Sequence, residues 1–410
     1  MSIEGPFLAA VIARMMEPKF NLAAYGVAFS FALMIEAPVI MIMSASTALV
    51  KNKQSFIKLR NFIYALNSVV TLLMLVFIIP FIFDFFTIGL IRLPQQVADL
   101  TYNAMVILLP WPGAIGYRRF YQGILIRNNQ TRRVAYGTVI RLTSMGITGL
   151  VLFYFSNFDG VMVGASALSI GVILEAIASK IMTWKIVEKL KKEKLNSIEN
   201  EKLTYKEIYN FYLPLALTST ITLGVQPLVI FFIGQSRFPI ESLAVLPVLT
   251  SFVFIFRSIG LSYQEVGIAL LSKYKGSYPV LKNFAVILGI ISVATLGLIA
   301  FTPLSDYWFK TVSGLSLELS HFAKIPLMIM ILMPGLSVLI NFQRAVLVES
   351  RYTKPITWAT IAEVVVILIV LFISIKYFDA VGAVAATLAL IIGRIGAITY
   401  LTPPLLNVKK

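Results

Sequence analysis

The chain has 410 residues, of which 58% are hydrophobic and 13% charged, and its formal net charge is +16. Soluble domains carry about 25% charged residues, so this composition is typical of a membrane protein. The absence of cysteine excludes disulfide bonds and thiolate-bound metal centres, and the single histidine excludes a histidine metal cluster.

Apolar segments of 18 or more residues can cross a hydrocarbon layer about 30 Å thick. A short apolar segment, Met1–Met16, comes first. Long segments then follow at 21–50, 57–86, 98–126, 131–156 and 159–186. After a polar stretch with seven lysines and five glutamates, Lys185–Glu207, more follow at 205–235, 241–272, 280–304, 320–348, 353–377 and 380–407. These segments predict an all-α membrane protein with about 12 transmembrane helices.

Basic residues gather in every second loop, at 51–60, 127–133, 185–207, 273–282, 351–354 and 409–410. The intervening loops carry few of them. By the positive-inside rule, both termini are predicted to be cytoplasmic and the protein to lie in the inner (plasma) membrane. The same distribution removes the reason to expect a nucleic-acid partner for so basic a chain.

One stretch of the chain, Leu109–Arg133, returns about 222 residues later as Met333–Lys354. Pro112-Gly113 recurs there as Pro334-Gly335. Near-constant spacing over almost the whole half predicts a duplication, with a lobe at 1–188, a basic connector at 189–204 and a second lobe at 205–410. Because six helices per lobe is an even number, the lobes should have the same orientation, related by a pseudo-twofold axis along the membrane normal.

The same alignment predicts a shortened first helix. Met1 falls opposite Thr222, in the middle of the span that begins near Tyr205. We therefore expect the first helix to start inside the bilayer, and a full-length first span would contradict this.

Three stretches carry a family resemblance: Leu22–Val50, Tyr212–Leu217 and Phe378–Leu388. Leu22–Val50 resembles the second span of the multidrug/oligosaccharidyl-lipid/polysaccharide flippase superfamily, and the 6+6 duplication is similar to the two-lobed fold of that superfamily. Tyr212–Leu217 and Phe378–Leu388 look like its progressive ankylosis branch. The resemblance implies an alternating-access exporter of organic solutes that exchanges them for protons or sodium, as in the multidrug and toxic compound extrusion branch. The alternatives are an exporter of small organic anions of the progressive ankylosis type and a flippase for a lipid-linked substrate. In the extrusion branch an acidic residue of the first span binds the coupling ion, and Glu4 falls near that place.

A charge inside a membrane span costs about 2.5–3.5 kcal/mol, so each one needs a partner or a wet cavity. The candidates for substrate or ion binding are Glu4, Glu36, Arg118, Arg257, Glu265 and Arg344. Further interior charges are Arg119, Arg141, Glu175, Glu363 and Arg394. A cavity lined by the carboxylates would suit cation export, and one lined by the arginines would suit anion export.

The repeat pairs several of these charges with opposite sign: Glu36 with Arg257, Arg141 with Glu363, and Glu175 with Arg394. One hypothesis is that Glu36 and Arg257 form an ion pair between the lobes in one conformation only. The favoured alternative is that each charge pairs within its own lobe. Arg257 and Glu265 are spaced to share a helix face.

Arg118 and Arg119 are adjacent and lie near the predicted end of a span, so we interpret them as side chains that reach the lipid headgroups. A basic vestibule for an anion is the alternative. The hinge candidates are Pro6, Pro112, Pro227 and Pro334, because both halves keep these prolines.

The chain shows neither a GxxxxGK[ST] phosphate loop nor a GxSxG elbow, so we expect a transporter rather than an enzyme. No cofactor or metal is predicted, apart from a proton or sodium as the coupling ion. The expected partners are a small organic substrate and membrane lipids, and the protein is expected to be a monomer.

Overall fold

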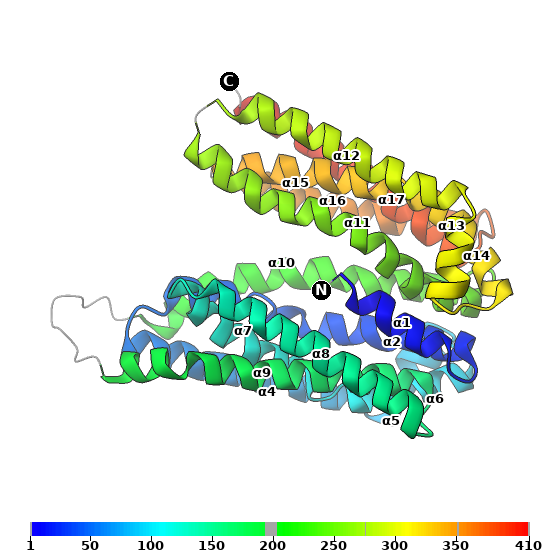
Figure 1. The fold of residues 1–410 in the computed structure, drawn as a ribbon, viewed down its shortest axis with the longest axis horizontal. Helices are drawn as coiled ribbons and strands as arrows, with labels where there is room; N and C mark the ends of the chain where they lie inside the picture. Colours follow the sequence, from blue (N-terminus) through cyan, green and yellow to red (C-terminus); the bar gives the residue numbers. More distant parts are fainter. Residues whose placement is uncertain (1, 193–202, 275, 351, 409–410) are drawn as a thin grey trace. The chain divides into compact units, whose positions relative to one another are not determined.

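The structure is a computed structural model that describes residues 2–192, 203–274, 276–350 and 352–408 (Figure 1). Over these residues the regular structure is helical, apart from an isolated β-bridge between Arg237 and Val381. Most of the predicted connector lies outside the described residues, but its first four residues continue a helix that ends at Lys192.

The helices of the first half are α1 (Glu4–Ala13), α2 (Pro18–Glu36), η1 (Ala37–Val39), α3 (Ile42–Leu49), α4 (Lys53–Phe77), α5 (Pro80–Asp84), η2 (Phe85–Leu90), α6 (Gln95–Ile107), α7 (Trp111–Arg127), α8 (Thr131–Phe155) and α9 (Gly160–Lys192). Those of the second half are α10 (Tyr205–Gly234), α11 (Pro239–Lys273), α12 (Tyr278–Phe301), α13 (Leu304–Asp306), η3 (Tyr307–Val312), α14 (Leu317–Met330), α15 (Met333–Glu349), α16 (Lys354–Lys376) and α17 (Gly382–Val408). Within the described residues, ten helical segments are long and apolar enough to cross a membrane. Most of the predicted spans, about 12 in number, are therefore present as long apolar helices, and the short α1 is the predicted first span.

The bounds of these helices repeat along the chain. The two π-helices η2 and η3 begin 222 residues apart, at Phe85 and Tyr307, and α7 and α15 repeat at the same spacing with 17 residues each. The residues before α2 and α11, Glu17 and Phe238, both have positive φ, at 48° and 54°. The duplication inferred from the sequence is therefore present in the secondary structure, down to the turns.

Prolines interrupt four segments that were predicted to be continuous. The 21–50 segment breaks between Glu36 and Ile42, at Pro38. The 57–86 segment stops at Phe77 and resumes at Pro80, and the 98–126 segment breaks between Ile107 and Trp111, next to Pro110 and Pro112. The 320–348 segment breaks in the same way ahead of Pro334. A proline has no backbone N–H and its ring clashes with the preceding turn, so a helix ends or restarts there.

The described chain forms two compact units. Unit 1 comprises Val27–Leu90 and Pro94–Pro227, and unit 2 comprises Ser2–Gly26, Ile91–Leu93 and the chain from Leu228 on. The packing thus differs from a simple cut at the connector: α1 belongs to unit 2, and α10 as far as Pro227 belongs to unit 1. The division into lobes at 1–188 and 205–410 stays a prediction.

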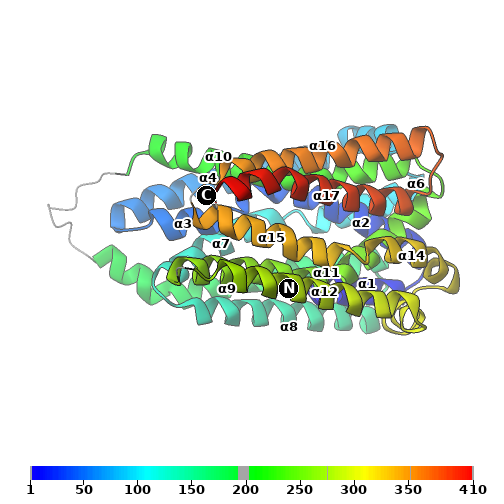
Figure 2. The ribbon, with the colours of Figure 1, turned by 90° about the horizontal axis from the view of Figure 1, so that it is seen from above.

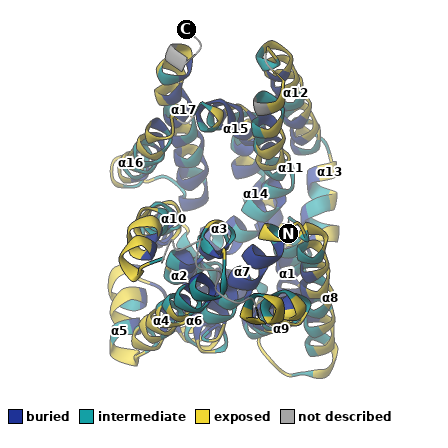
Figure 3. Ribbon diagram, turned by 90° about the vertical axis from the view of Figure 1, so that its left-hand side faces the viewer, coloured by how far each residue is buried: buried dark blue, intermediate teal, exposed yellow. Residues whose placement is uncertain are grey.

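One helix lies at the centre of each unit. α7 packs on α3, α4 and α9 in unit 1, and α15 packs on α11, α12 and α17 in unit 2 (Figure 2). Only Arg127 of α7, and Leu339 and Glu349 of α15, are exposed, whereas the flanking helices turn many exposed residues outward (Figure 3). In a membrane this arrangement is held by close van der Waals packing and interior hydrogen bonds, because lipid is as apolar as the side chains.

The first helix is short, as predicted: α1 has ten residues and corresponds to the last part of α10. It is tied to unit 2 at both ends. A Cβ added at Gly5 would lie 2.6 Å from the Ser251 Cβ, so only glycine allows this approach to α11. At the other end, Arg14 Nη2 donates to the carbonyls of Thr311 and Val312 at 2.6 and 3.0 Å.

Candidate functional site: buried ionic clusters

Unit 1 holds a cluster of charges around Glu175 of α9, whose side chain is fully buried. Arg118 of α7 donates from Nη1 to Glu175 Oε2, and Arg141 Nε of α8 lies 3.4 Å from the same oxygen. Gln122 Nε2 donates to Oε1 at 2.9 Å. Both carboxylate oxygens of Glu175 are therefore satisfied by protein groups.

The local sequence explains how three helices bring these groups together. Arg118 and Gln122 are four residues apart, so they share one face of α7. Gly171 of α9 lies against α8, where an added Cβ would be only 3.2 Å from the Arg141 carbonyl oxygen. Small residues at such contacts let membrane helices approach closely, which brings Arg141 into reach of Glu175.

Glu36 is the last residue of α2 and lies in the same unit, 4% exposed. Its Oε2 has no hydrogen-bond partner among the described residues. Arg119, followed by Arg118 and Arg141, is the cation that interacts with it most strongly. Glu36 therefore differs from Glu175, because one of its carboxylate oxygens is buried without a hydrogen bond.

The chain bends directly after Glu36, where Pro38 forms the 3₁₀ turn η1. The bend frees backbone carbonyls, and α10 satisfies two of them. Ser219 Oγ donates to the Ala37 carbonyl at 2.7 Å, and the Tyr212 hydroxyl donates to the Pro38 carbonyl. Freed carbonyls at membrane depth need such partners, so these two bonds fix the place of Glu36.

Unit 2 has its own ion pair, between Glu363 of α16 and Arg394 of α17, with 2.9 Å between Oε1 and Nε. Two further arginines, Arg257 and Arg344, interact electrostatically with both members of this pair. Arg257 of α11 donates from Nε to Ser337 Oγ at 3.3 Å. Arg344 of α15 is half-buried, and its Nε has no hydrogen-bond partner among the described residues.

The ion pairs of the two units use corresponding helices with the charges exchanged. In unit 1 the arginine is on α8 and the glutamate on α9; in unit 2 the glutamate is on α16 and the arginine on α17. In both ion pairs the two partners belong to the same unit, while the alternative that Glu36 and Arg257 each pair within their own lobe stays a prediction. Across both units, six interior arginines accompany three interior glutamates: Arg118, Arg119, Arg141, Arg257, Arg344 and Arg394 with Glu36, Glu175 and Glu363.

The other predicted site residues differ from one another in how far they are buried. Arg118 is 2% exposed, so the interpretation that it reaches lipid headgroups is wrong: the break before α7 places it in the middle of a buried helix. Glu265 is exposed on α11, and the described residues give it no ion pair with Arg257. Glu4 is half-buried in the first turn of α1. The hypothesis that Glu36 pairs with Arg257 stays a prediction.

The proline candidates fall into two kinds. Pro112 and Pro334 occupy the first turn of α7 and α15, where a proline costs no hydrogen bond. Pro6 is likewise near the start of α1. Pro227 lies inside α10 and is the last residue of unit 1 before the chain enters unit 2.

The sequence analysis did not select Gln122, Ser219 or Ser337, which contact the charged residues or the bend. A signal existed for Gln122, since a glutamine four residues after a buried arginine is a polar neighbour on the same face. The described residues contain no group of three or more acidic or histidine side chains arranged to hold a metal ion.

No protein-family model matches the sequence, and no curated protein matches it. Solved structures match over the whole chain. An inward-facing multidrug resistance MATE family transporter of the MOP superfamily aligns with a TM-score of 0.78 and 15% identity, covering 100% of this chain and 95% of that one. The lipid II flippase MurJ, in an inward closed conformation, aligns at 0.72 and 15% identity, covering 100% and 86%.

A MOP superfamily transporter from Pyrococcus furiosus, whose binding pocket is described as having reverse polarity, aligns at 0.63 and 14% identity and covers 100% and 95%. At these identities the likeness shows the fold. The chain has the fold of MATE transporters and MurJ, and the resemblance to the superfamily is confirmed at that level. Together with the ten apolar spans, this fold makes the chain an integral membrane protein.

Proposed function

We propose that the protein is an alternating-access membrane transporter that exports organic solutes in exchange for protons or sodium. Its two halves would act as six-helix lobes of the same orientation, related by a pseudo-twofold axis along the membrane normal. The repeated helix bounds and the fold shared with known transporters and a flippase support this proposal. Both termini would be cytoplasmic, in the inner membrane, and the protein would act as a monomer without nucleic acid.

The observation that carries the proposal is that each unit keeps charged side chains in the interior of its helices. Each such charge costs about 2.5–3.5 kcal/mol to insert. In a protein without a polar pathway, nine interior charges would only destabilise the membrane-inserted state. Glu36 is the candidate for the coupling ion, because it is buried, one of its oxygens has no hydrogen bond, and it lies beside Arg119.

An organic anion is the second candidate substrate class, and the excess of arginine favours it. Glu175 occupies Arg118 and Arg141, and Glu363 occupies Arg394. In the described part of the chain no carboxylate forms an ion pair with Arg257 or Arg344, and Arg257 donates to the Ser337 hydroxyl. Guanidinium groups held in this way suit carboxylate or phosphate ligands. A lipid-linked substrate, by analogy with the MurJ fold, is a third class that carries the same negative charge.

The test uses proteoliposomes with a proton gradient and two fluorescent organic probes of similar size, one anionic and one cationic. We expect faster flux of the anion, a loss of that flux in Arg257→Gln and Arg344→Gln, and loss of gradient dependence in Glu36→Gln. The control is Glu318→Gln, since that carboxylate is exposed and is not a candidate site residue. Selective flux of the cation would overturn the anion proposal. If neither probe nor a lipid-linked substrate crossed the membrane, the proposal that the protein is a transporter would be overturned.

A further inference from the structure

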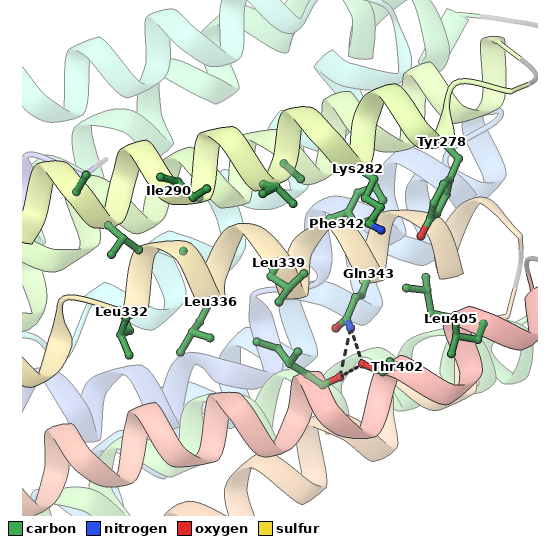
Figure 4. Close-up of a pocket in the computed structure, with 18 residues that line it drawn as sticks. Tyr278, Lys282, Ile290, Leu332, Leu336, Leu339, Phe342, Gln343, Thr402 and Leu405 are labelled. Carbon is green, nitrogen blue, oxygen red and sulfur yellow. Dashed lines mark hydrogen bonds between the residues drawn. The ribbon is translucent and has the colours of Figure 1, made fainter.

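The surface of unit 2 carries a groove with a volume of about 700 Å³. Its walls are α12 and α17, and its floor is α15 (Figure 4). Ligand sites in proteins occupy about 300–1,000 Å³, so this groove has the size of one. None of the charged residues of the candidate site lines it.

The chemistry of the groove changes along its length. Tyr278, Lys282, Gln343 and Thr402 gather at one end, whereas the labelled side chains toward the other end, Ile290, Leu332 and Leu336, are hydrocarbon (Figure 4). Lys282 follows the first turn of α12. The groove is therefore amphipathic, with a cationic end at the beginning of a membrane span and an apolar remainder.

The apolar part has the length of one lipid leaflet. From Lys282 to Ala294, the last α12 residue of the lining, the helix rises about 18 Å at roughly 1.5 Å per residue. Half of a hydrocarbon core about 30 Å thick is about 15 Å. A chain that starts at Lys282 and follows the groove thus ends near the bilayer centre.

The polar end offers two groups to a headgroup. Lys282 is exposed, and the structure records no ion pair for it within the described ranges. Gln343 is 3% exposed: its Nε2 donates to the Ile398 carbonyl and to Thr402 Oγ1, both at 3.2 Å, while its Oε1 has no partner. No carboxylate lines the groove, so the polar end, with Lys282, is complementary to the phosphate of a headgroup.

The duplication provides an independent observation, because unit 1 has a groove of about 420 Å³ between α4 and α9 over α7. Arg60 stands 222 residues before Lys282 and Tyr121 stands 222 before Gln343. Bulky rings shorten this copy: Tyr64 takes the place of Val286, and Trp184 that of Leu406. The cation at the groove mouth is thus present in both halves, and the long apolar channel belongs to unit 2.

We propose that the unit 2 groove binds one acyl chain of an anionic glycerophospholipid, with the headgroup phosphate at Lys282. The amphipathic lining, the leaflet length and the lysine without a carboxylate together select this occupant over a soluble apolar molecule. Binding here is separate from transport and does not require the proposed function.

The test is native mass spectrometry of the full-length protein in detergent, with phosphatidylglycerol and phosphatidylcholine of identical acyl chains added. We expect phosphatidylglycerol to be retained preferentially, and Lys282→Ala to weaken its binding roughly fivefold, as for one basic residue at a membrane surface. Lys273→Ala, an exposed lysine outside the groove lining, is the matched control and should bind as the parent does.

A second pair of variants tests the acyl channel. Ala294 lines the apolar part of the groove and is exposed, so Ala294→Leu should fold and block the channel for both lipids. Gly297→Leu, on the same helix but outside the lining, should leave binding unchanged. Thermal unfolding checks that all variants fold.

Three results would overturn the proposal: equal retention of the two lipids, unchanged binding in Lys282→Ala, or unchanged binding in Ala294→Leu. Displacement of the lipid by a soluble organic anion would do so as well, because it would make the groove a solute site.

Discussion

Among individual residues, the exchanged ion pairs are the most informative feature of the molecule. Arg141–Glu175 and Glu363–Arg394 join corresponding helices with opposite polarity. A buried pair adds little net stability over an apolar pair, but removing one partner leaves an unpaired charge at a cost of about 3–5 kcal/mol. A change at one member of either pair should therefore be tolerated only together with a matching change at its partner.

This constraint predicts a charge-swap rescue in unit 2. Glu363→Ala and Arg394→Ala should each destabilise the protein by about 3 kcal/mol, because the remaining partner stays largely buried. The double variant Glu363→Arg/Arg394→Glu recreates the polarity found in unit 1 and should recover most of that loss. Thermal unfolding in detergent measures all three, and a double variant no more stable than the singles would contradict the pairing.

A second prediction concerns Asp306, which lies outside the spans. The Lys324 and Lys310 ammonium groups, 2.7 and 3.2 Å away, hold the pKa of this carboxyl below its usual value. A lower pKa in the native state than in the unfolded chain stabilises the native state above the unfolded pKa, and the contribution disappears as the pH falls through the native pKa.

Asp306→Asn should therefore lower the melting temperature slightly at neutral pH and leave it unchanged in acid. Asp84 is the repeat counterpart 222 residues earlier, exposed and without a recorded ion pair in the described chain, so Asp84→Asn should show no such pH dependence. Parallel pH profiles for the two variants would show that the lysines have no effect.

Among the four hinge candidates, three prolines lie in the first turn of a helix and one, Pro227, lies inside a helix. Pro227 removes a backbone hydrogen bond inside α10 at the residue where the chain leaves unit 1. If the halves move during transport, α10 should bend there, since proline is a common cause of helix kinks.

Pro227→Ala should therefore slow transport severalfold without lowering the melting temperature, because alanine restores the missing bond. Pro214→Ala is the matched control: it lies in the same helix, but within unit 1, and should transport normally. Equal rates for the two variants would remove Pro227 from the hinge candidates.

The sequence predicted the spans well because apolar length and charged loops report directly on the bilayer. It did not predict the burial of Arg118 or the exposure of Glu265. Both depend on which face of a helix points inward, and that follows from where α7 restarts after Pro110 and how far α11 continues, to Lys273. The repeat showed that Arg141 corresponds to Glu363 and Glu175 to Arg394, but it did not predict which of these residues pair with each other.

At the scale of the whole molecule, one duplication organises the fold, the ionic clusters and the two grooves. The helix starts repeat at 221–225 residues, as at Pro18 and Pro239, Lys53 and Tyr278, and Gly160 and Gly382. The proposed mechanism depends on an even number of spans per half, which would give both halves the same orientation.

The most direct test is sided labelling, for which the absence of native cysteine makes the chain suitable. Single cysteines at the repeat-related exposed positions Asp159 and Asp379, and at Lys51 and Lys273, would be treated with a membrane-impermeant maleimide in intact cells. We predict that cysteines at 159 and 379 both react, and that those at 51 and 273 react only after permeabilisation. Labelling of the two members of a pair from opposite sides of the membrane would contradict the parallel duplication.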